Sequence, residues 1–183
     1  MVSIETPVCN FNMPAMDFNL KGVDGKRYSL ERCKGKNGLL VMFICNHCPY
    51  VKAIIERIVK DTKELQMVGV NTVAIMSNNP EEYEADSFEN MQKIAKKMKF
   101  SFPYLIDETQ EVAQAYGAVC TPDFFGYNAD LTLQYRGQLD ASRKASASTE
   151  VKRDLFDAMY QVATTGQGPI EQIPSMGCSI KWK

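Results

Sequence analysis

Residues 42–55 read MFICNHCPYVKAII. The apolar run of residues 38–45, typical of a strand buried on both faces, stops at Cys45. Two polar residues, one of them the only histidine of the chain, separate it from Cys48. Pro49 then begins a stretch in which apolar residues recur at helical spacing. This stretch therefore predicts a junction between a buried strand and a helix, with two thiols placed at the junction.

Two thiols at a helix start predict redox chemistry. Unpaired backbone N–H groups and the positive end of the helix dipole favour a thiolate there. Cys45, at the predicted exposed start, is expected to attack a disulfide, and Cys48, inside the first turn, is expected to resolve the mixed disulfide. A charged His47 would stabilise the thiolate and hence the reduced form. Pro49 is tolerated in a first helical turn.

Two other interpretations of the motif stay open. Cys45, His47 and Cys48 are all ligand types that bind zinc or copper, which would make the chain a metal-binding protein. Zinc normally takes four ligands, and the sequence has no second C-x-x-C or H-x₃-H motif. The two cysteines are otherwise small core residues of a redox-silent binding fold. The redox interpretation requires neither a metal nor an organic cofactor.

The rest of the chain alternates between strand and helix patterns, which predicts a mostly parallel sheet in an α/β fold. A late hairpin makes the predicted sheet mixed. The expected elements, in chain order, are a hairpin turning at Asp24-Gly25, the strand before Cys45, the helix after Pro49, a strand at 70–77, a helix opening at Asn79-Pro80, a strand at 102–107, a helix at 109–116 ended by Gly117, a hairpin turning at 128–130, and a last helix opening at Thr149. Residues 140–150 form the most polar loop.

Composition bounds the class of protein. The formal net charge is −1, from 21 basic and 22 acidic residues, and no basic stripe suggests nucleic-acid binding. No apolar run approaches the roughly 18 residues of a spanning helix. We expect a soluble protein in a reducing cytoplasm, where its six cysteines are not structural staples.

The motifs together resemble the thioredoxin superfamily. The sequence VCTPDFFGYNAD at 119–130 follows the strand, C-x-x-C-P and helix, and Thr121-Pro122 is similar to the cis Thr-Pro that faces the active-site disulfide in that superfamily. The resemblance implies that Thr121 and Pro122 orient a bound partner. Over roughly residues 12–183, the chain looks like the peroxiredoxin-like branch, the alkyl hydroperoxide reductase and thiol-specific antioxidant (AhpC/TSA) family.

The resemblance implies one thioredoxin-like domain over 1–183. Its central mixed sheet would be flanked by helices, with a peroxiredoxin-like N-terminal hairpin and a helical insertion. Residues 1–11 would be an N-terminal extension and residues 166–183 a C-terminal tail.

Departures from the peroxiredoxin pattern decide between two activities. Peroxiredoxins carry P-x-x-x-T-x-x-C, whose last position is Cys48 here, but the proline and threonine positions hold Val41 and Cys45. No arginine matches the family's catalytic arginine; Arg136 and Arg143 are the nearest. Because peroxide cleavage needs fixed donors for the leaving oxygen, we predict a thiol–disulfide oxidoreductase first and a thiol peroxidase as the alternative.

The remaining expectations concern partners and accessory thiols. A disulfide-containing protein or small thiol would be the substrate, with an external thiol reductant. Thioredoxin's buried acid position holds Leu39, so the proton acceptor for Cys48 is unassigned. Cys120 and Cys178 are possible accessory thiols, and Trp182 is expected to anchor the tail by burying its ring.

Overall fold

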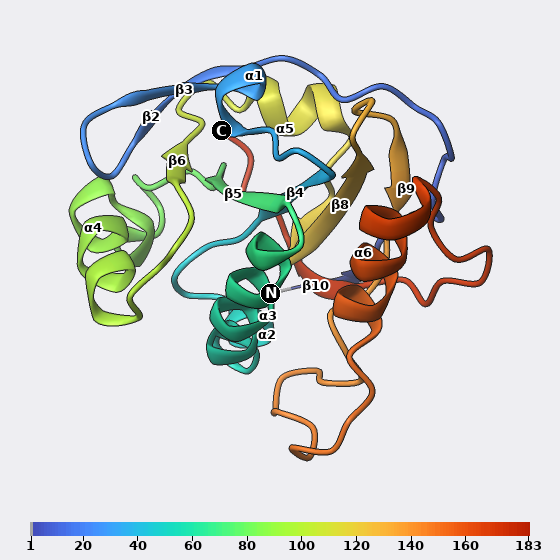
Figure 1. Cartoon of the computed structure of the whole chain (residues 1–183). Coiled ribbons are helices and arrows are strands. Elements are labelled where there is room, and N and C mark those ends of the chain that lie inside the picture. Colours follow the sequence, from blue (N-terminus) through green and yellow to red (C-terminus); the bar gives the residue numbers. More distant parts are fainter. Residues whose placement is uncertain (1) are drawn as a thin grey trace.

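The apolar run before Cys45 forms the central strand of a mixed sheet. In the computed structural model, which describes residues 2–183, β4 (Gly38–Phe43) is buried along its whole length. It pairs in parallel with β5 (Val70–Met76) and antiparallel with β8 (Asp123–Asn128). The strand order is β3-β2-β6-β5-β4-β8-β9, with β2 (Asn19–Gly22), β3 (Arg27–Ser29), β6 (Tyr104–Ile106) and β9 (Leu133–Tyr135). The predicted mixed α/β sheet is confirmed (Figure 1). The expectation that it is mostly parallel was wrong, because only the pairings of β5 with β4 and β6 are parallel, and the other four pairings of this sheet are antiparallel.

Both predicted hairpins are present. β2 and β3 pair antiparallel across Asp24-Gly25, where Gly25 takes the left-handed conformation with φ +80°. β8 and β9 pair antiparallel around the second turn, in which the Asn128 side chain accepts hydrogen bonds from the backbone of Asp130 and Thr132. Turn chemistry that is local in sequence therefore formed as expected.

A second sheet joins the two ends of the chain. β10 (Met176–Ser179) lies between β1 (Ser3–Glu5) and β7 (Cys120–Thr121), and both pairings are antiparallel. The tail showed no clear period in sequence, and its strand forms through these long-range pairings. This sheet brings the tail to the start of β8, next to the end of β4.

The helices cover both faces of the large sheet. They are α1 (Leu30–Cys33), α2 (Pro49–Lys52), α3 (Ile55–Met67), the 3₁₀ helix η1 (Glu84–Asp86), α4 (Phe88–Lys97), α5 (Glu111–Tyr116) and α6 (Asp154–Thr165). In Figure 1, α5 lies on one side of β4 and β8, and α3 and α6 lie on the other. None of the helices within residues 2–183 is long and apolar enough to cross a bilayer.

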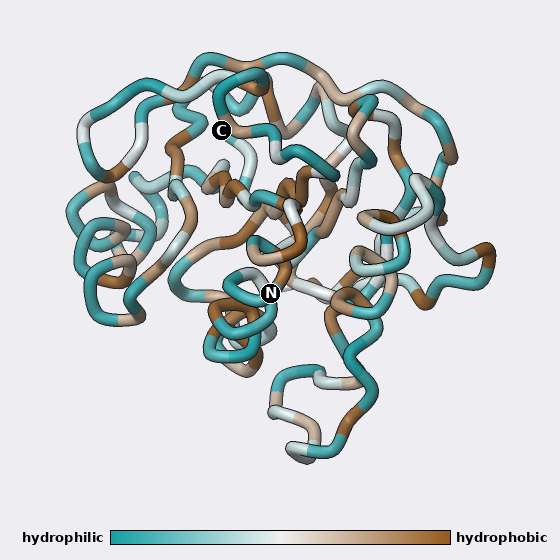
Figure 2. Tube along the Cα trace, viewed as in Figure 1, coloured by the Kyte–Doolittle hydropathy of each residue, from teal (hydrophilic) through white to brown (hydrophobic). Residues whose placement is uncertain are grey.

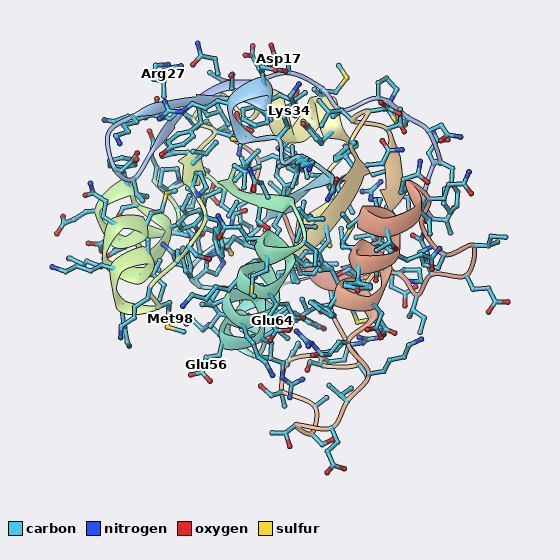
Figure 3. The ribbon with its side chains drawn as sticks, in the orientation of Figure 1. Asp17, Arg27, Lys34, Glu56, Glu64 and Met98 are labelled. Carbon is cyan, nitrogen blue, oxygen red and sulfur yellow. The ribbon has the colours of Figure 1, made fainter. Side chains whose placement is uncertain are left out.

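The alternation of β4 explains why it is buried on both faces. Leu40 and Met42 join the core cluster that contains residues of α3 and α6, whereas Leu39, Val41 and Phe43 join the cluster that contains residues of α5. Figure 2 shows the hydrophobic residues concentrated in the strands at the centre. In Figure 3, Glu56 at the start of α3 extends away from the sheet.

Three predicted helix boundaries were wrong. No helix opens at Asn79-Pro80; α4 begins after Ser87, whose side chain accepts from the Asn90 N–H. Asn79 instead makes a side-chain turn with the Glu81 N–H, and its own N–H is bound by the tail carbonyl of Lys181. A tertiary contact therefore replaced the predicted cap.

The other two boundaries changed because of the polar loop. The last helix begins at Asp154 and not at Thr149, because Arg57 holds the loop through Asp140, Ser142 and the carbonyls of Ala147 and Ser148. The helix after Pro49 is divided into α2 and α3, and the Ser146 hydroxyl donates to the Ala53 carbonyl at the break. This loop, orange in Figure 1, projects from the lower side.

Candidate active site

Cys45 and Cys48 lie where β4 gives way to α2. Cys45 is in the short connection after the strand, and Cys48 is the N-cap residue of α2, followed by Pro49 at the first helical position. Both thiols are free, and the exposed fractions are 2% for Cys45 and 0% for Cys48. The expectation of an exposed Cys45 was therefore wrong. Cys48 caps the helix and does not lie inside its first turn.

Thr121 and Pro122 lie directly against the two sulfur atoms. Because β8 runs antiparallel to β4, with Asp123 opposite Phe43, the residues before β8 meet the residues after β4. The Thr121–Pro122 peptide bond is cis. Cys45 Sγ is 3.3 Å from Thr121 Oγ1, and Cys48 Sγ is 3.1 Å from the Thr121 carbonyl oxygen, to which it can donate only while it is protonated. The structure thus brings together the cysteine motif and the Thr-Pro motif.

His47 is held by a buried carboxylate that the sequence did not reveal. Asp86, in η1, is fully buried, and its Oδ2 is 2.5 Å from His47 Nδ1. Asp86 also accepts from the backbone N–H groups of Asn46 and His47 and from the Asn78 side chain. The His47 ring stacks on Tyr83, with centroids 4.4 Å apart. The acidic stretch around Asp86 therefore supplies the missing acid of the site.

No local signal in the sequence marks Asp86 as part of this site. It lies among four other acids and two aromatic residues at 81–89, a pattern typical of a solvated helix face. Burial of Asp86 arises because η1 packs over the Cys45–Cys48 connection, where Asn46 Nδ2 donates to the Ala85 carbonyl. The Tyr104 hydroxyl fixes the same amide by donating to Asn46 Oδ1 at 3.0 Å.

The electrostatics of the site favour a thiolate on Cys48. A hydrogen bond from the Cys45 thiol lowers the pKa of Cys48 to about 5, and the backbone N–H groups of Val51 and Cys178 and the Cys178 thiol contribute. The same hydrogen bond, burial and the Asp86 carboxylate raise the pKa of Cys45 well above its ordinary value. In the reduced protein the charge therefore lies on Cys48, contrary to the predicted thiolate on Cys45.

Cys178 joins the site, and Cys120 lies beside it. Cys178 is opposite Thr121 in the β10–β7 pairing and belongs to the same core cluster as Cys45 and Cys48. Cys120 is buried one residue before Thr121, and its thiol faces the Pro122 carbonyl at 3.5 Å. Burial raises the pKa of Cys120 far above its usual range. Of the two predicted accessory thiols, Cys178 is the one that shares a core cluster with both motif cysteines.

The tail is not anchored by its tryptophan, which corrects the sequence-based expectation. The Trp182 side chain is 41% exposed. Polar contacts hold the tail instead: the Lys181 N–H donates to Asn78 Oδ1, and the Lys181 carbonyl accepts from the Asn79 N–H and the Gln110 side chain. The backbone of Lys181 replaces the ring as the anchor.

Neither candidate arginine reaches the sulfur atoms to donate to them. Arg136 is buried in a pair with Asp123, at 2.9 Å, and also donates to the Gly117 carbonyl. Arg143 donates to Gln138 Oε1 and to the Ser142 carbonyl. In this conformation the hydroxyl of Thr121 is the side-chain donor available to Cys45.

Cys45, His47 and Asp86 could supply three metal-ligand atoms, all within 4.8 Å of one another. Cys48, the predicted third ligand, is outside this set. His47 Nδ1 and Asp86 Oδ2 are only 2.5 Å apart, whereas two ligands about 2.0 Å from one tetrahedral zinc are roughly 3.3 Å apart. A metal would have to separate this hydrogen-bonded pair, and elemental analysis of the purified protein tests that alternative.

Comparisons with known proteins place these features in context. Residues 11–142 match the AhpC/TSA family. No curated protein matches the sequence. The chain is 43% identical to an uncharacterized conserved protein from Geobacillus kaustophilus, with a TM-score of 0.94 and coverage of 100% of this chain and 97% of the other. It is 36% identical to a hypothetical protein from Sinorhizobium meliloti 1021, with a TM-score of 0.92 and 98% of each chain covered.

A more distant structure relates the fold to a thioredoxin. The pneumococcal exposed lipoprotein thioredoxin Etrx1 from Streptococcus pneumoniae is 22% identical, with a TM-score of 0.57. The match covers 81% of this chain and 98% of the other. At this level of identity the likeness supports the fold alone, and the fold is thioredoxin-like.

Proposed function

Because this chain belongs to the AhpC/TSA family and is an oxidoreductase, we propose that it is a thiol–disulfide oxidoreductase whose redox pair is Cys45 and Cys48. One observation carries the proposal: both sulfurs lie against the same residue, with Cys45 Sγ 3.3 Å from the Thr121 hydroxyl oxygen and Cys48 Sγ 3.1 Å from the Thr121 carbonyl oxygen. Two sulfurs in contact can pass between dithiol and disulfide with little movement of the backbone. The enzyme class follows from the family, and the pair is our assignment.

The proposed reaction has two exchange steps. Cys45, after losing its proton, attacks a partner disulfide; a bond from Cys45 to one partner sulfur forms, and the other sulfur leaves as a thiolate. The Cys48 thiolate then attacks Cys45 Sγ, which forms the Cys45–Cys48 disulfide and releases the first partner sulfur as a thiolate. The partner gains two electrons, and the dithiol loses two. An external thiol would reduce the disulfide again.

Neighbouring residues support these roles. The low pKa of Cys48, about 5, keeps it charged and ready to resolve a mixed disulfide at neutral pH. Asp86, paired with His47, is the buried base nearest to Cys45, with its oxygen within 4.8 Å of the sulfur. We propose that this pair receives the Cys45 proton. Thr121 would hold the Cys45 sulfur through its hydroxyl, and the cis Pro122 would keep the backbone close to it.

Burial of the Cys45 and Cys48 sulfurs limits which partners can reach them. Since the two sulfurs are almost completely buried, a protein partner can react only after η1 or the tail moves aside. A cytoplasmic location and reduction by an external thiol stay predictions from the sequence.

Trapping tests the assignment directly. The Cys48→Ser variant, treated with glutathione disulfide, is expected to accumulate a stable mixed disulfide at Cys45, which mass spectrometry of alkylated peptides locates. The wild-type protein should instead show the Cys45–Cys48 disulfide. Cys33→Ser is the control, because Cys33 is buried in the core cluster on the other face of the sheet. A mixed disulfide found only at Cys48 in the Cys45→Ser variant would reverse the proposed order of attack.

A second candidate function, peroxide reduction, is favoured by the lowered pKa of Cys48. This thiolate occupies the peroxidatic position of the family pattern, and a small peroxide needs less access than a protein. Stopped-flow measurement of peroxide consumption tests it. A rate no faster than that of free cysteine, at the same pH, rejects the peroxidase and leaves disulfide exchange.

A further inference from the structure

The tail strand occupies the position at which a docked peptide would meet the redox pair. β7 has one hydrogen-bonded neighbour within residues 2–183, and that neighbour is β10 of the same chain. Adding an extended strand to a free edge is a common way for proteins to bind a peptide. Here Cys178 takes the place opposite Thr121, and Ser179 pairs with Cys120. The chain thus presents one of its own cysteines where an external thiol would be presented.

Cys178 and Cys48 meet at the same residue. Cys178 is opposite Thr121 in the β10–β7 pairing, and Cys48 Sγ is 3.1 Å from the Thr121 carbonyl oxygen. Both cysteines belong to the core cluster that also contains Cys45, and both neighbouring thiols lower the pKa of Cys48. Cys48 can therefore bond to either neighbour.

The close approach of β10 depends on a missing side chain. A Cβ at Gly177 would lie 2.1 Å from the Thr121 carbonyl oxygen and 3.0 Å from Pro122 N. Real Cβ atoms do not come that close to backbone atoms, so any other residue at Gly177 would push β10 away from Thr121. Glycine is thus the one residue type at position 177 that permits β10 to pack directly against Thr121.

We propose that Cys178 is a third redox thiol, which takes over the disulfide from Cys45 by attacking Cys48. The inference rests on the proposed Cys45–Cys48 disulfide. The Cys178 thiolate attacks Cys48 Sγ; the Cys48–Cys178 bond forms and the Cys45–Cys48 bond breaks. Cys45 leaves as a thiolate and takes up the proton that Cys178 gave up. No electrons are gained or lost in this step, and Cys45 returns to its reduced form while the tail becomes covalently attached.

The electrostatics change in favour of this step once the pair is oxidised. In the reduced protein, burial together with the hydrogen bond and the charge of Cys48 raises the pKa of Cys178 to about 11. Both effects of Cys48 disappear when that sulfur is in a disulfide. Lys181 and Lys144, which lower the pKa of Cys178, remain. Cys178 thus becomes easier to ionise when its target is present.

Disulfide mapping tests the proposal in the full chain. Wild type, Cys178→Ser, Cys45→Ser and Cys120→Ser proteins are oxidised with glutathione disulfide, alkylated under native conditions and mapped by mass spectrometry. We expect a Cys48–Cys178 linkage in wild type, its complete loss in Cys178→Ser, and markedly slower formation in Cys45→Ser, which lacks the Cys45–Cys48 disulfide from which the step starts. Cys120→Ser is the matched control, since Cys120 is equally buried on the neighbouring strand and should change nothing. Circular dichroism of each variant verifies the fold.

The outcomes separate this inference from the proposed function. If wild type and Cys178→Ser both form Cys45–Cys48, and no folded variant forms Cys48–Cys178, the role of Cys178 is overturned and the redox pair stands. If Cys48–Cys178 forms and Cys45–Cys48 never does, the proposed pair is wrong and Cys178 is the partner of Cys48. If neither linkage forms in folded protein, both proposals fail.

Discussion

At the scale of single residues, the site depends on which sulfur carries the charge. Cys48 combines the start of a helix with two neighbouring thiols, whereas Cys45 is buried beside the carboxylate of Asp86. Dipole and hydrogen bonds favour the anion at Cys48, and desolvation and like charge oppose it at Cys45. The C-x-x-C spacing is thus compatible with a thiolate at either cysteine, and the residues around each sulfur decide which one is charged.

Removing the Cys45 thiol should raise the pKa of Cys48. The hydrogen bond from Cys45 is the largest cause of the lowered value of about 5, so Cys45→Ala removes it. We expect the midpoint of thiolate absorbance at 240 nm to rise by at least one pH unit. Cys33→Ala, at a buried thiol on the other face of the sheet, should leave the midpoint unchanged. Equal midpoints in Cys45→Ala and wild type would contradict the hydrogen-bonded pair.

The same pKa gives a pH dependence of stability. A folded-state pKa of about 5 lies below the ordinary value of 9.0, so the Cys48 contribution is fully present above pH 9 and is lost as the pH falls through 5. The raised pKa of Cys45 changes stability only above pH 9. As the pH increases from 5 to 9, the free energy of unfolding of the reduced wild type should therefore increase relative to that of Cys48→Ser. Urea denaturation at each pH measures both values. A difference in unfolding free energy between the two proteins that does not change with pH would contradict the lowered pKa of Cys48.

Asp86 should be a stabilising residue as well as a proposed base. Its carboxylate is fully buried and accepts two backbone N–H groups and two side-chain donors. Asp86→Asn removes the charge opposite His47 and places a donor where acceptors are needed. We expect a loss of about 3 kcal/mol in unfolding free energy by chemical denaturation. Asp157→Asn, on the exposed side of α6, should change it by less than about 0.5 kcal/mol.

At the scale of elements, the sequence predicted strands and turns better than helix starts. The buried runs of β4 and β5 and the glycine end of α5 depend on residues adjacent in sequence, and they formed as expected. The cap predicted at Asn79 did not form, because its backbone and side chain bind elsewhere. The Thr-Pro motif was located from its resemblance to a known family, whereas Asp86 had no comparable signal. Its role depends on η1 packing against a connection 40 residues earlier.

The β10 strand provides a test at this scale. Gly177→Ala introduces a Cβ that would overlap the Thr121 carbonyl. We expect β10 to shift away from β7, with a loss of about 1–3 kcal/mol in unfolding free energy and loss of the Cys48–Cys178 linkage on oxidation. Ser179→Ala is the control in the same strand and should retain the linkage. A Gly177→Ala protein of wild-type stability with the linkage intact would show that the strand does not need this close approach.

At the scale of the whole molecule, Asn78 connects three distant segments. It follows β5, its Nδ2 donates to Asp86, and its Oδ1 accepts from the N–H of Lys181 in the tail. One buried amide therefore connects the end of β5 with two segments that lie over the redox pair, η1 and the C-terminal tail. We call these two segments the covers of the site. Loosening of either cover should affect the other, because both depend on the same side chain.

Asn78→Ala should release the tail and disturb the cover together. Loss of two buried hydrogen bonds is expected to cost about 2 kcal/mol in unfolding free energy. Trp182, the only tryptophan, reports on the tail, so its acrylamide quenching should increase in the folded variant. Iodoacetamide labelling of Cys45 should also accelerate. Asn71→Ala, which removes a bond to the Lys34 carbonyl but none to η1 or the tail, is the control. Increased quenching without faster labelling would show that the two covers are independent.

The pairing of β1 with β10 has a practical consequence for anyone who works with this protein. Ser3, Ile4 and Glu5 are opposite Cys178, Gly177 and Met176, so the first residues of the chain support the strand that touches the thiols. An affinity tag fused ahead of Ser3 would lie within a few residues of the β1–β10 pairing. A tag after Lys183 would lie a few residues beyond the other end of β10. Cleavable tags, and assays repeated after their removal, are therefore advisable before any rate or potential is assigned to the native enzyme.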